Sequence, residues 1–287
     1  MTLVDWQLRT RALSNDDHTL VMGVVNVTPD SFSDGGRFFD QAEAVAHGRR
    51  LAAAGADLVD VGGESTRPGA PPVSAEEEAR RVVPVVRALA ADGIVVSVDT
   101  TKACVAEESL SAGGEIVNDV SALSDPAMAA LIADRGAGVV LMHMQGTPAT
   151  MQADPHYDDV TAEVLAALLE SAALAESSGI GRERICLDPG IGFGKSIEHN
   201  LRLLHDLEAF TSTSYPVILG TSRKSFLGAL AGLPDPLDRD AATAGTTALA
   251  VAAGVFCVRV HDVPGNLQSA RVADAIVRSR NFDEVGG

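Results

Sequence analysis

The chain has 287 residues, of which 46% are hydrophobic, and its formal net charge is −17. A charge this negative argues against a nucleic-acid-binding protein and against attraction to anionic membranes, because both partners are themselves anionic. The sequence holds no apolar run of membrane-spanning length and no charged-then-apolar segment at its start, which together predict a cytoplasmic protein.

Short apolar segments recur along the chain and are predicted to be β-strands. They are apolar at successive positions, which is typical of parallel strands that are covered on both faces. The segments between them carry helix signals, such as the capping box Ser74-Ala-Glu-Glu77 and a glycine, Gly93, at the expected helix end. The predicted strands are residues 20–27, 57–61, 94–98, 115–118, 138–142, 184–187, 216–220 and 255–260.

Strands that alternate with helices in this way predict an α/β protein with a single closed (β/α)8 TIM barrel. We assign the barrel to residues 20–283, an N-terminal extension that covers the barrel bottom to residues 1–19, and a tail to residues 284–287. An open, doubly wound sheet is the alternative fold. It is less favoured because no GxGxxG pattern follows the first strand and because eight units suit closure.

The cysteines of the chain are Cys104, Cys186 and Cys257, and they stand far apart in apolar segments. Such spacing excludes a disulfide framework and a zinc site. We expect all three to be packing residues, because a free cysteine behaves as a small hydrophobic side chain.

Polar groups follow every predicted strand at its carboxyl end. In barrels of this kind the loops after the strands converge, and catalytic residues lie there. The sequence therefore predicts that one rim of the barrel carries the functional site. The polar groups are Asn26, the stretch Gly62-Gly63-Glu64, Asp99, Asn118, His143, Asp188, the stretch Ser222-Arg223-Lys224, and Arg259 with His261.

Asp99, Asn118 and Asp188 make the acidic and amide side of this rim. A carboxylate accepts two parallel N–H bonds, so it suits the amidine-like edge of a heterocycle, and an asparagine can donate and accept beside it. The alternative is that each residue only caps the helix that follows, since Asp and Asn favour that position.

Arg223, Lys224, Arg259 and His261 make the basic side of the rim, at the ends of the last two strands. These strands are neighbours in a barrel, and their loops frequently build a phosphate site. A solvated surface cluster is the alternative. Asn26 is a candidate Mg²⁺ ligand, because hard cations prefer oxygen donors and share their coordination with substrate phosphates.

Two long loops at the same rim, residues 28–38 and 64–73, are candidate lids over the site. The stretch from Asp188 to Ser196 is rich in glycine but does not fit a nucleotide-binding phosphate loop, because Pro189 stands where the first glycine is required. Its glycines are expected to let the backbone approach a flat ligand beside Phe193.

Motifs along the chain resemble those of the dihydropteroate synthases, in the order in which that family has them. Two of them are highly specific: residues 26–36 read NVTPDSFSDGG, and residues 60–69 read DVGGESTRPG. The match extends over nearly the whole chain from about Leu20. The remaining motifs are Ser97-Val-Asp-Thr100, Asn118-Asp119, Asp188-Pro-Gly-Ile-Gly-Phe193, Thr221-Ser-Arg-Lys224 and Arg259-Val-His261.

The resemblance implies a transferase of folate biosynthesis. Such an enzyme condenses 6-hydroxymethyl-7,8-dihydropterin diphosphate with p-aminobenzoate and releases 7,8-dihydropteroate and pyrophosphate. The pterin methylene C–O bond would ionise before the aniline nitrogen attacks, so the site must stabilise a leaving group and shield a cation from water. The resemblance also implies a Mg²⁺ ion and a homodimer.

The resemblance further implies a role for each site residue. Asp99, with Lys224, Asp34 and Arg259, would act in catalysis, Asp34 as a contact to the metal or the cation. The pterin would be bound by Asp99, Asn118, Asp188 and Lys224, with Met142 packed against the ring and Arg259 stacked on it. The diphosphate and the metal would be held by Asn26, Arg259 and His261. The p-aminobenzoate site would be lined by Phe32, Thr66, Arg67, Pro68, Phe193 and Ser225.

Two other functions on this fold are open alternatives. A pterin methyltransferase that serves a corrinoid partner would share Asp99, Asn118 and Asp188 but would not need the diphosphate cluster or the two loops. A paralogue that binds pterin without turning it over is disfavoured by the intact Lys224 and Arg67. Fold alone does not separate these functions, and the motifs do.

Overall fold

The computed structural model describes residues 5–28, 37–65 and 69–279. Within them, parallel strands form a barrel in the order β8-β7-β6-β5-β4-β3-β10-β9. A bridge between Leu187 and Val217, and a 2.9 Å hydrogen bond from the Leu187 N–H to the Pro216 carbonyl, bring its two edges together. The predicted TIM barrel is confirmed. Its strands are β3 (Leu20–Asn26), β4 (Leu58–Gly62), β5 (Val96–Asp99), β6 (Ile116–Asp119), β7 (Gly138–Met142), β8 (Ile185–Asp188), β9 (Ile218–Leu219) and β10 (Cys257–Val260).

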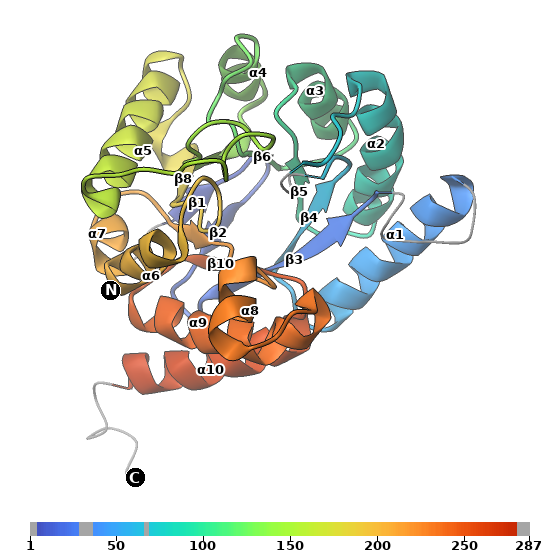
Figure 1. Cartoon of the computed structure of the whole chain (residues 1–287). Coiled ribbons are helices and arrows are strands. Elements are labelled where there is room, and N and C mark those ends of the chain that lie inside the picture. Colours follow the sequence, from blue (N-terminus) through green and yellow to red (C-terminus); the bar gives the residue numbers. More distant parts are fainter. Residues whose placement is uncertain (1–4, 29–36, 66–68, 280–287) are drawn as a thin grey trace.

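Helices follow the strands and form the outer ring of the barrel (Figure 1). Ser74 caps α2, because its side chain accepts a hydrogen bond from the backbone N–H of Glu77, which is one half of the predicted capping box. No helix among the described residues is long and apolar enough to cross a membrane. The helices are α1 (Arg37–Ala53), α2 (Ala75–Ala91), α3 (Ala103–Ser111), α4 (Met128–Arg135), α5 (Val160–Ser177), α6 (Ile197–His205), α7 (Leu207–Thr211), α8 (Ser225–Ala231), α9 (Asp240–Ala252) and α10 (Val263–Arg278).

The barrel strands alternate between two apolar clusters. Val59 and Val61 of β4, like Val21 and Val25 of β3, belong to the large core between the strands and the surrounding helices. The intervening residues point into the barrel, where Met22 and Leu58 belong to a second, smaller cluster. Because side chains alternate along a strand, residues in phase with this inner cluster face the barrel axis.

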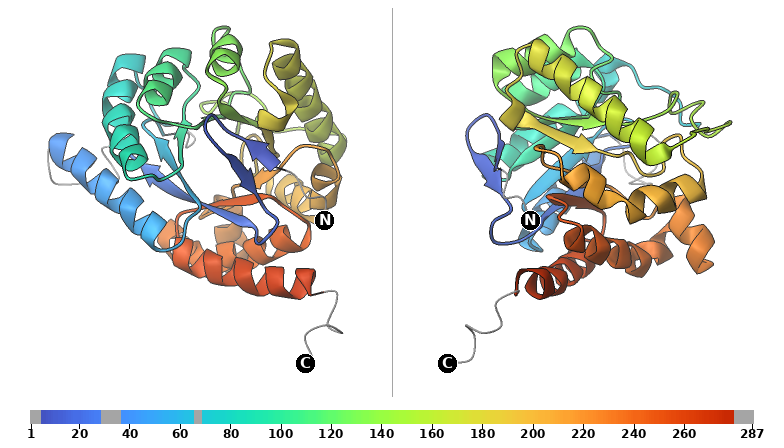
Figure 2. Two further views of the ribbon diagram at one scale, coloured as in Figure 1. Left: turned by 180° about the vertical axis from the view of Figure 1, so that it is seen from behind. Right: turned by 90° about the vertical axis from the view of Figure 1, so that its left-hand side faces the viewer.

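An N-terminal hairpin of β1 (Asp5–Gln7) and β2 (Ala12–Ser14) closes the bottom of the barrel. Trp6 is completely buried within the inner cluster, and its ring lies edge-on to Phe256 with centroids 6.2 Å apart. Its indole N–H donates to the carbonyl of Arg184 at 2.8 Å. The hairpin crosses one end of the barrel in the left view of Figure 2. The expectation that the extension covers the bottom is therefore confirmed.

The cysteines do not all pack in the core, and the expectation is wrong for one of them. Cys186 and Cys257 are buried inside the barrel, as expected. Cys104 is exposed on α3. The two residues that follow it, Val105 and Ala106, are the ones that bury against the core, so the helical phase turns Cys104 to solvent.

Candidate active site

The polar residues at the strand ends face the barrel axis, as the sequence predicts. Asp99 and Asn118 are register partners on β5 and β6, and Met142 and Asp188 are partners on β7 and β8. Each is in phase with inner-cluster residues such as Ile116, Val140 or Cys186 on its own or a neighbouring strand. The parallel register thus gathers carboxylate, amide and thioether groups at one end of the barrel.

Arg259 lies between two carboxylates at this rim. Its Nε atom donates to Oδ2 of Asp60 at 2.7 Å, and its Nη2 atom donates to Oδ2 of Asp99 at 2.9 Å. The Asn118 amide donates to the same Asp60 oxygen at 3.1 Å. The acidic and basic groups are therefore interleaved, and the predicted division into an acidic and a basic side is wrong for Arg259. The reason is that β10 lies next to β3, so that β3 and β4 alone separate it from β5 on that side of the barrel.

Asp60 is a member of the site to which the sequence assigned no role. It points inward from the middle of β4, and its side chain is fully buried. Its Oδ1 atom has no hydrogen-bond partner among the described residues. The available signal was an acidic residue inside an otherwise apolar strand, because a buried charge is retained only where it is paired.

Burial raises the pKa of Asp99 to about 7. The charge of Arg259 acts to lower this pKa, and the charge of Asp60 acts to raise it further. Burial alone would lower the pKa of Arg259, but the charges of Asp60 and Asp99 outweigh it and raise that pKa. Arg259 is therefore permanently cationic, whereas Asp99 gains or loses its proton near neutrality.

Asp188, Lys224 and Phe193 lie together beside this network. Asp188 is 8% exposed, and its Oδ1 atom accepts a 2.8 Å hydrogen bond from the N–H of Gly190. The Lys224 ammonium donates to the carbonyl of Ile191 and stands 4.4 Å from the centroid of the Phe193 ring. Burial raises the pKa of Asp188, opposed by Lys224, and lowers the pKa of Lys224 to about 8. This pair places a carboxylate acceptor and a cation next to an aromatic face.

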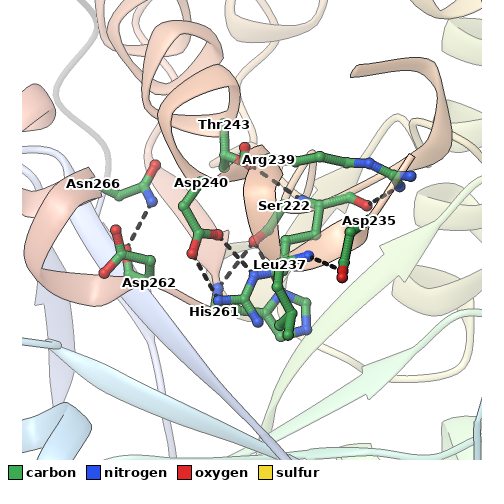
Figure 3. Close-up of polar contacts among 10 residues, drawn as sticks. Ser222, Asp235, Leu237, Arg239, Asp240, Thr243, His261, Asp262 and Asn266 are labelled. Carbon is green, nitrogen blue, oxygen red and sulfur yellow. Dashed lines mark hydrogen bonds and ion pairs between the residues drawn. The ribbon is translucent and has the colours of Figure 1, made fainter. Parts of the chain in front are cut away.

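His261 is held by Ser222 at the ends of the last two strands. The Ser222 hydroxyl accepts from the backbone N–H of His261 at 3.0 Å and lies 2.9 Å from its Nδ1 atom. These two residues meet below the start of α9, where Asp240 and Thr243 lie (Figure 3). The contact fixes the orientation of the imidazole at the rim.

Arg223 does not join the basic cluster, which corrects that expectation. Its Nε and Nη2 atoms donate to the two carboxylate oxygens of Asp240 at 2.7 and 2.8 Å. The residue has a left-handed backbone, with φ of 59°, which directs its side chain differently from that of Lys224. Of the predicted basic cluster, Lys224 and Arg259 therefore remain at the site, with His261 beside them. Ser225 follows as the exposed first residue of α8.

Asn26 ends β3 with its side chain half-buried, level with Gly62 of β4. The described residues contain no group of three or more His, Cys, Asp or Glu side chains that could hold a metal ion. A single carboxamide oxygen fits Mg²⁺ only where a substrate phosphate and water complete the coordination, which is how this ion is usually bound. The donor set therefore suits a metal that arrives with a diphosphate.

Several predicted site residues lie outside the part of the chain that the structure describes. They are Phe32, Asp34, Thr66, Arg67 and Pro68. The described start of the second loop is anchored by Glu64, whose carboxylate accepts from the N–H of Val73 at 2.9 Å and from the Lys102 ammonium. Lys102 also bonds to the buried Glu78. The roles predicted for the five residues stay predictions.

Comparison with known proteins agrees with this geometry. The family model described as pterin binding enzyme matches residues 22–261. Dihydropteroate synthase of Escherichia coli is 46% identical over 264 residues, which cover 92% of this chain and 93% of that protein. A probable bifunctional folylpolyglutamate synthase/dihydropteroate synthase of Haloferax volcanii is 47% identical over 268 residues, which cover 93% of this chain but only 32% of that protein.

A solved structure is similar over almost its whole length. Dihydropteroate synthase of Xanthomonas albilineans with 4-aminobenzoic acid superposes with a TM-score of 0.90 at 45% identity, covering 96% of this chain and 98% of that one. The family match extends over far more than half of the chain, and the identity is high over nearly all of it. The chain therefore belongs to the pterin-binding enzyme family and, within it, to the dihydropteroate synthases.

Proposed function

We propose that this protein condenses 6-hydroxymethyl-7,8-dihydropterin diphosphate with p-aminobenzoate to give 7,8-dihydropteroate and pyrophosphate. The observation that carries the proposal is the rim itself, where the paired Asp60, Asp99 and Arg259 stand beside Asp188 and Lys224. This set offers acceptors for a flat heterocycle and cations for a leaving diphosphate. A relative whose structure was solved with 4-aminobenzoic acid supports p-aminobenzoate as the second substrate.

The pterin would bind over Asp188 and Asn118. Oδ1 of Asp188 accepts one backbone hydrogen bond, so the carboxylate keeps lone pairs for the amino-pyrimidine edge. The Lys224 ammonium is close enough to Asp188 to oppose the rise in its pKa and can donate to a ring acceptor. Met142, at the same level on β7, offers a polarisable apolar surface to the ring.

The diphosphate would lie towards Arg259, His261 and Asn26. Arg259 brings a permanent positive charge, and Ser222 holds the imidazole of His261 in place. Mg²⁺, when bound through Asn26 and the diphosphate, would supply positive charge to the departing pyrophosphate. Removal of the metal by a chelator should therefore abolish product formation and leave pterin binding intact.

The reaction asks the protein to stabilise charge rather than to remove a proton from carbon. The C–O electron pair leaves with the pyrophosphate, and the pterin methylene becomes a cation that the ionised Asp99 can stabilise. The aniline nitrogen then bonds to the methylene and releases its proton. Phe193 and Ser225 would line the p-aminobenzoate site together with Phe32, Thr66, Arg67 and Pro68, and Asp34 would contact the metal or the cation.

Product formation tests this proposal directly. Purified protein is incubated with the pterin diphosphate, p-aminobenzoate and Mg²⁺, and dihydropteroate and pyrophosphate are measured by liquid chromatography and a coupled assay. We expect equal amounts of both products, and only when all three components are present. A folded protein that binds pterin without forming product would instead be a silent paralogue or a corrinoid-linked methyltransferase.

We also propose that the protein is a homodimer that pairs through α9 and α10. Leu249 on α9 and Val272 and Ile276 on α10 are 62%, 63% and 70% exposed. Exposed apolar residues gathered on adjacent helices are typical of an interaction surface. Light scattering of the purified protein should give twice the chain mass, and Val272→Glu should give the mass of one chain. A monomeric wild-type protein would contradict the proposal.

A further inference from the structure

The turn of residues 190–194, which follows β8, has every carbonyl engaged by a side chain. Lys195 Nζ donates to the carbonyls of residues 190 and 193, both at 2.9 Å. Lys224 donates to the carbonyl of residue 191, Gln152 to that of residue 192 at 2.8 Å, and Tyr157 to that of residue 194 at 2.9 Å. A glycine-rich turn would otherwise have many conformations, and these bonds restrict it to one.

Lys195 joins this turn to the end of β7. Its side chain is buried, and its ammonium also lies 3.0 Å from Nδ1 and 3.3 Å from the carbonyl of His143. The two segments touch backbone to backbone, since a Cβ atom on Gly190 would stand 1.9 Å from the carbonyl oxygen of His143. An ammonium has three donors, so the surrounding acceptors satisfy it fully.

The choice of lysine here is informative, because the chain uses lysine sparingly. Of its 22 basic residues only Lys102, Lys195 and Lys224 are lysines, and all three follow strand ends at the catalytic rim. Everywhere else the basic residue is arginine. A compact ammonium fits among converging carbonyls, whereas a planar guanidinium needs a wider space.

The turn connects the two halves of the proposed site. The N–H of Gly190 donates to Oδ1 of Asp188 at 2.8 Å, so a shift of the turn would rotate the carboxylate that faces the pterin. Phe193, at the other end of the turn, is the aromatic residue proposed to contact p-aminobenzoate. The position of both groups therefore depends on the position of the turn.

We propose that Lys195 is a positioning residue for the condensation. It holds the turn of residues 190–194 against the end of β7 and thereby orients Asp188 towards the pterin and Phe193 towards p-aminobenzoate. This inference rests on the proposed function. Lys195 would not contact either substrate. It acts through the turn, and a misplacement of about 1 Å in a catalytic site can cost on the order of 100-fold in rate.

The charge of Lys195 supports a pH-dependent form of this role. Burial and the neighbouring Lys224 lower the pKa of Lys195 to about 7, opposed by Asp188. His143, the other titratable group in contact, has its pKa lowered to about 3 by burial and by Lys195, so it is neutral and can accept at Nδ1. Above pH 7 the ammonium loses a proton and one donor, so two donors remain for the four acceptors, and the link between the turn and the end of β7 weakens.

The test compares Lys195→Met with Gln152→Ala. The first removes the buried ammonium at nearly constant length, and the second removes an exposed, neutral hydrogen bond from the same turn. For Lys195→Met we expect faster amide hydrogen exchange in residues 188–195 and a loss on the order of 100-fold in kcat/KM, shared by both substrates. Gln152→Ala should stay within about threefold of the wild type, because an exposed hydrogen bond contributes little.

The pH profile separates positioning from general stability. Wild-type kcat/KM should fall as the pH rises above about 7, whereas in Lys195→Met the decline should begin only near pH 8, where Lys224 loses its proton. Lys195→Arg should not restore the rate. Unchanged exchange and unchanged kinetics in Lys195→Met would overturn the proposal, as would an equal effect of Gln152→Ala. Hydrogen exchange reports on the turn even if the wild type forms no dihydropteroate, so failure of the proposed function would be recognised separately.

Discussion

Arg259 and Asp60 form an ion pair inside the barrel, with Nε of Arg259 2.7 Å from Oδ2 of Asp60. The Asp60 side chain is completely buried and that of Arg259 is 23% exposed. A second pair, Arg223 with Asp240, has the same 2.7 Å distance, but its side chains are 25% and 27% exposed. The Asp60 carboxylate is buried and the Asp240 carboxylate is not, so the two pairs compare a buried with a partly exposed carboxylate.

Asp60→Asn should destabilise the fold far more than Asp240→Asn. Asp60→Asn leaves Arg259 with Asp99 as its one remaining carboxylate partner among the described residues, and the loss of a buried partner costs about 3 kcal/mol. A partly exposed pair is screened by water and contributes about 1 kcal/mol or less. Urea unfolding of the two variants measures both free energies. Equal losses would show that the inner pair is no more important for stability than the outer one.

Asp188→Asn should weaken pterin binding without unfolding the protein. The substitution replaces one acceptor oxygen by a donor and removes the charge, and hydrogen bonds to charged groups contribute about 1.5–3 kcal/mol. The expected loss in affinity is therefore roughly 10- to 100-fold, measured by calorimetry with a pterin ligand. Asp206→Asn, the same change at the end of α6 and away from the rim, is the control. Wild-type affinity in Asp188→Asn would contradict the assignment of this carboxylate.

The rate should also depend on the protonation of Asp99. Its pKa is raised to about 7, first by burial, so the ionised form is lost as the pH falls through 7. If the carboxylate stabilises the developing cation, kcat/KM declines below that pH, and Asp99→Asn is slow and lacks this acidic limb. The pH dependence of folding stability has the opposite sign to that of the rate. Between the unfolded value of 3.8 and the folded value of about 7, the native state holds the proton, so the contribution of Asp99 to stability is lost as the pH rises.

The sequence was sufficient to predict the barrel, because each buried strand had to be a short apolar run. All the predicted strands are present, although β9 is reduced to Ile218–Leu219 and its neighbour β8 is met by a single bridge at Val217. The strand ends also identified Asp99, Asn118 and Asp188 as members of one rim, since parallel strands present their carboxyl ends there; Asp99 and Asn118 are register partners, and Asp188 is the partner of Met142.

The pairing of charges could not be predicted in the same way. Asp60 and Arg259 are 199 positions apart and meet only because β10 closes the barrel next to β3. Arg223 precedes Lys224 directly, yet its left-handed backbone sends it to Asp240 on α9. Lys195 resembles a solvent-facing residue of a loop until the surrounding carbonyls are seen. Such contacts depend on side-chain direction in three dimensions, which local sequence does not encode.

The N-terminal hairpin offers a prediction at the opposite end of the barrel. Trp6 is fully buried against Phe256, so Trp6→Ala should leave a cavity and cost about 3–5 kcal/mol in the free energy of unfolding. Leu174→Ala on α5, where the side chain is 55% exposed, is the control and should change that free energy by about 0.5 kcal/mol or less.

Because the hairpin lies at the bottom and the site at the opposite rim, Trp6→Ala should leave the KM values for both substrates unchanged at a temperature where the variant is folded. Urea unfolding and steady-state kinetics on the same preparation separate the two effects. A raised KM for the pterin diphosphate in the folded variant would mean that packing at the barrel bottom is coupled to the rim. The inner cluster of Met22, Leu58 and Ile116 is the physical path along which such coupling would have to run.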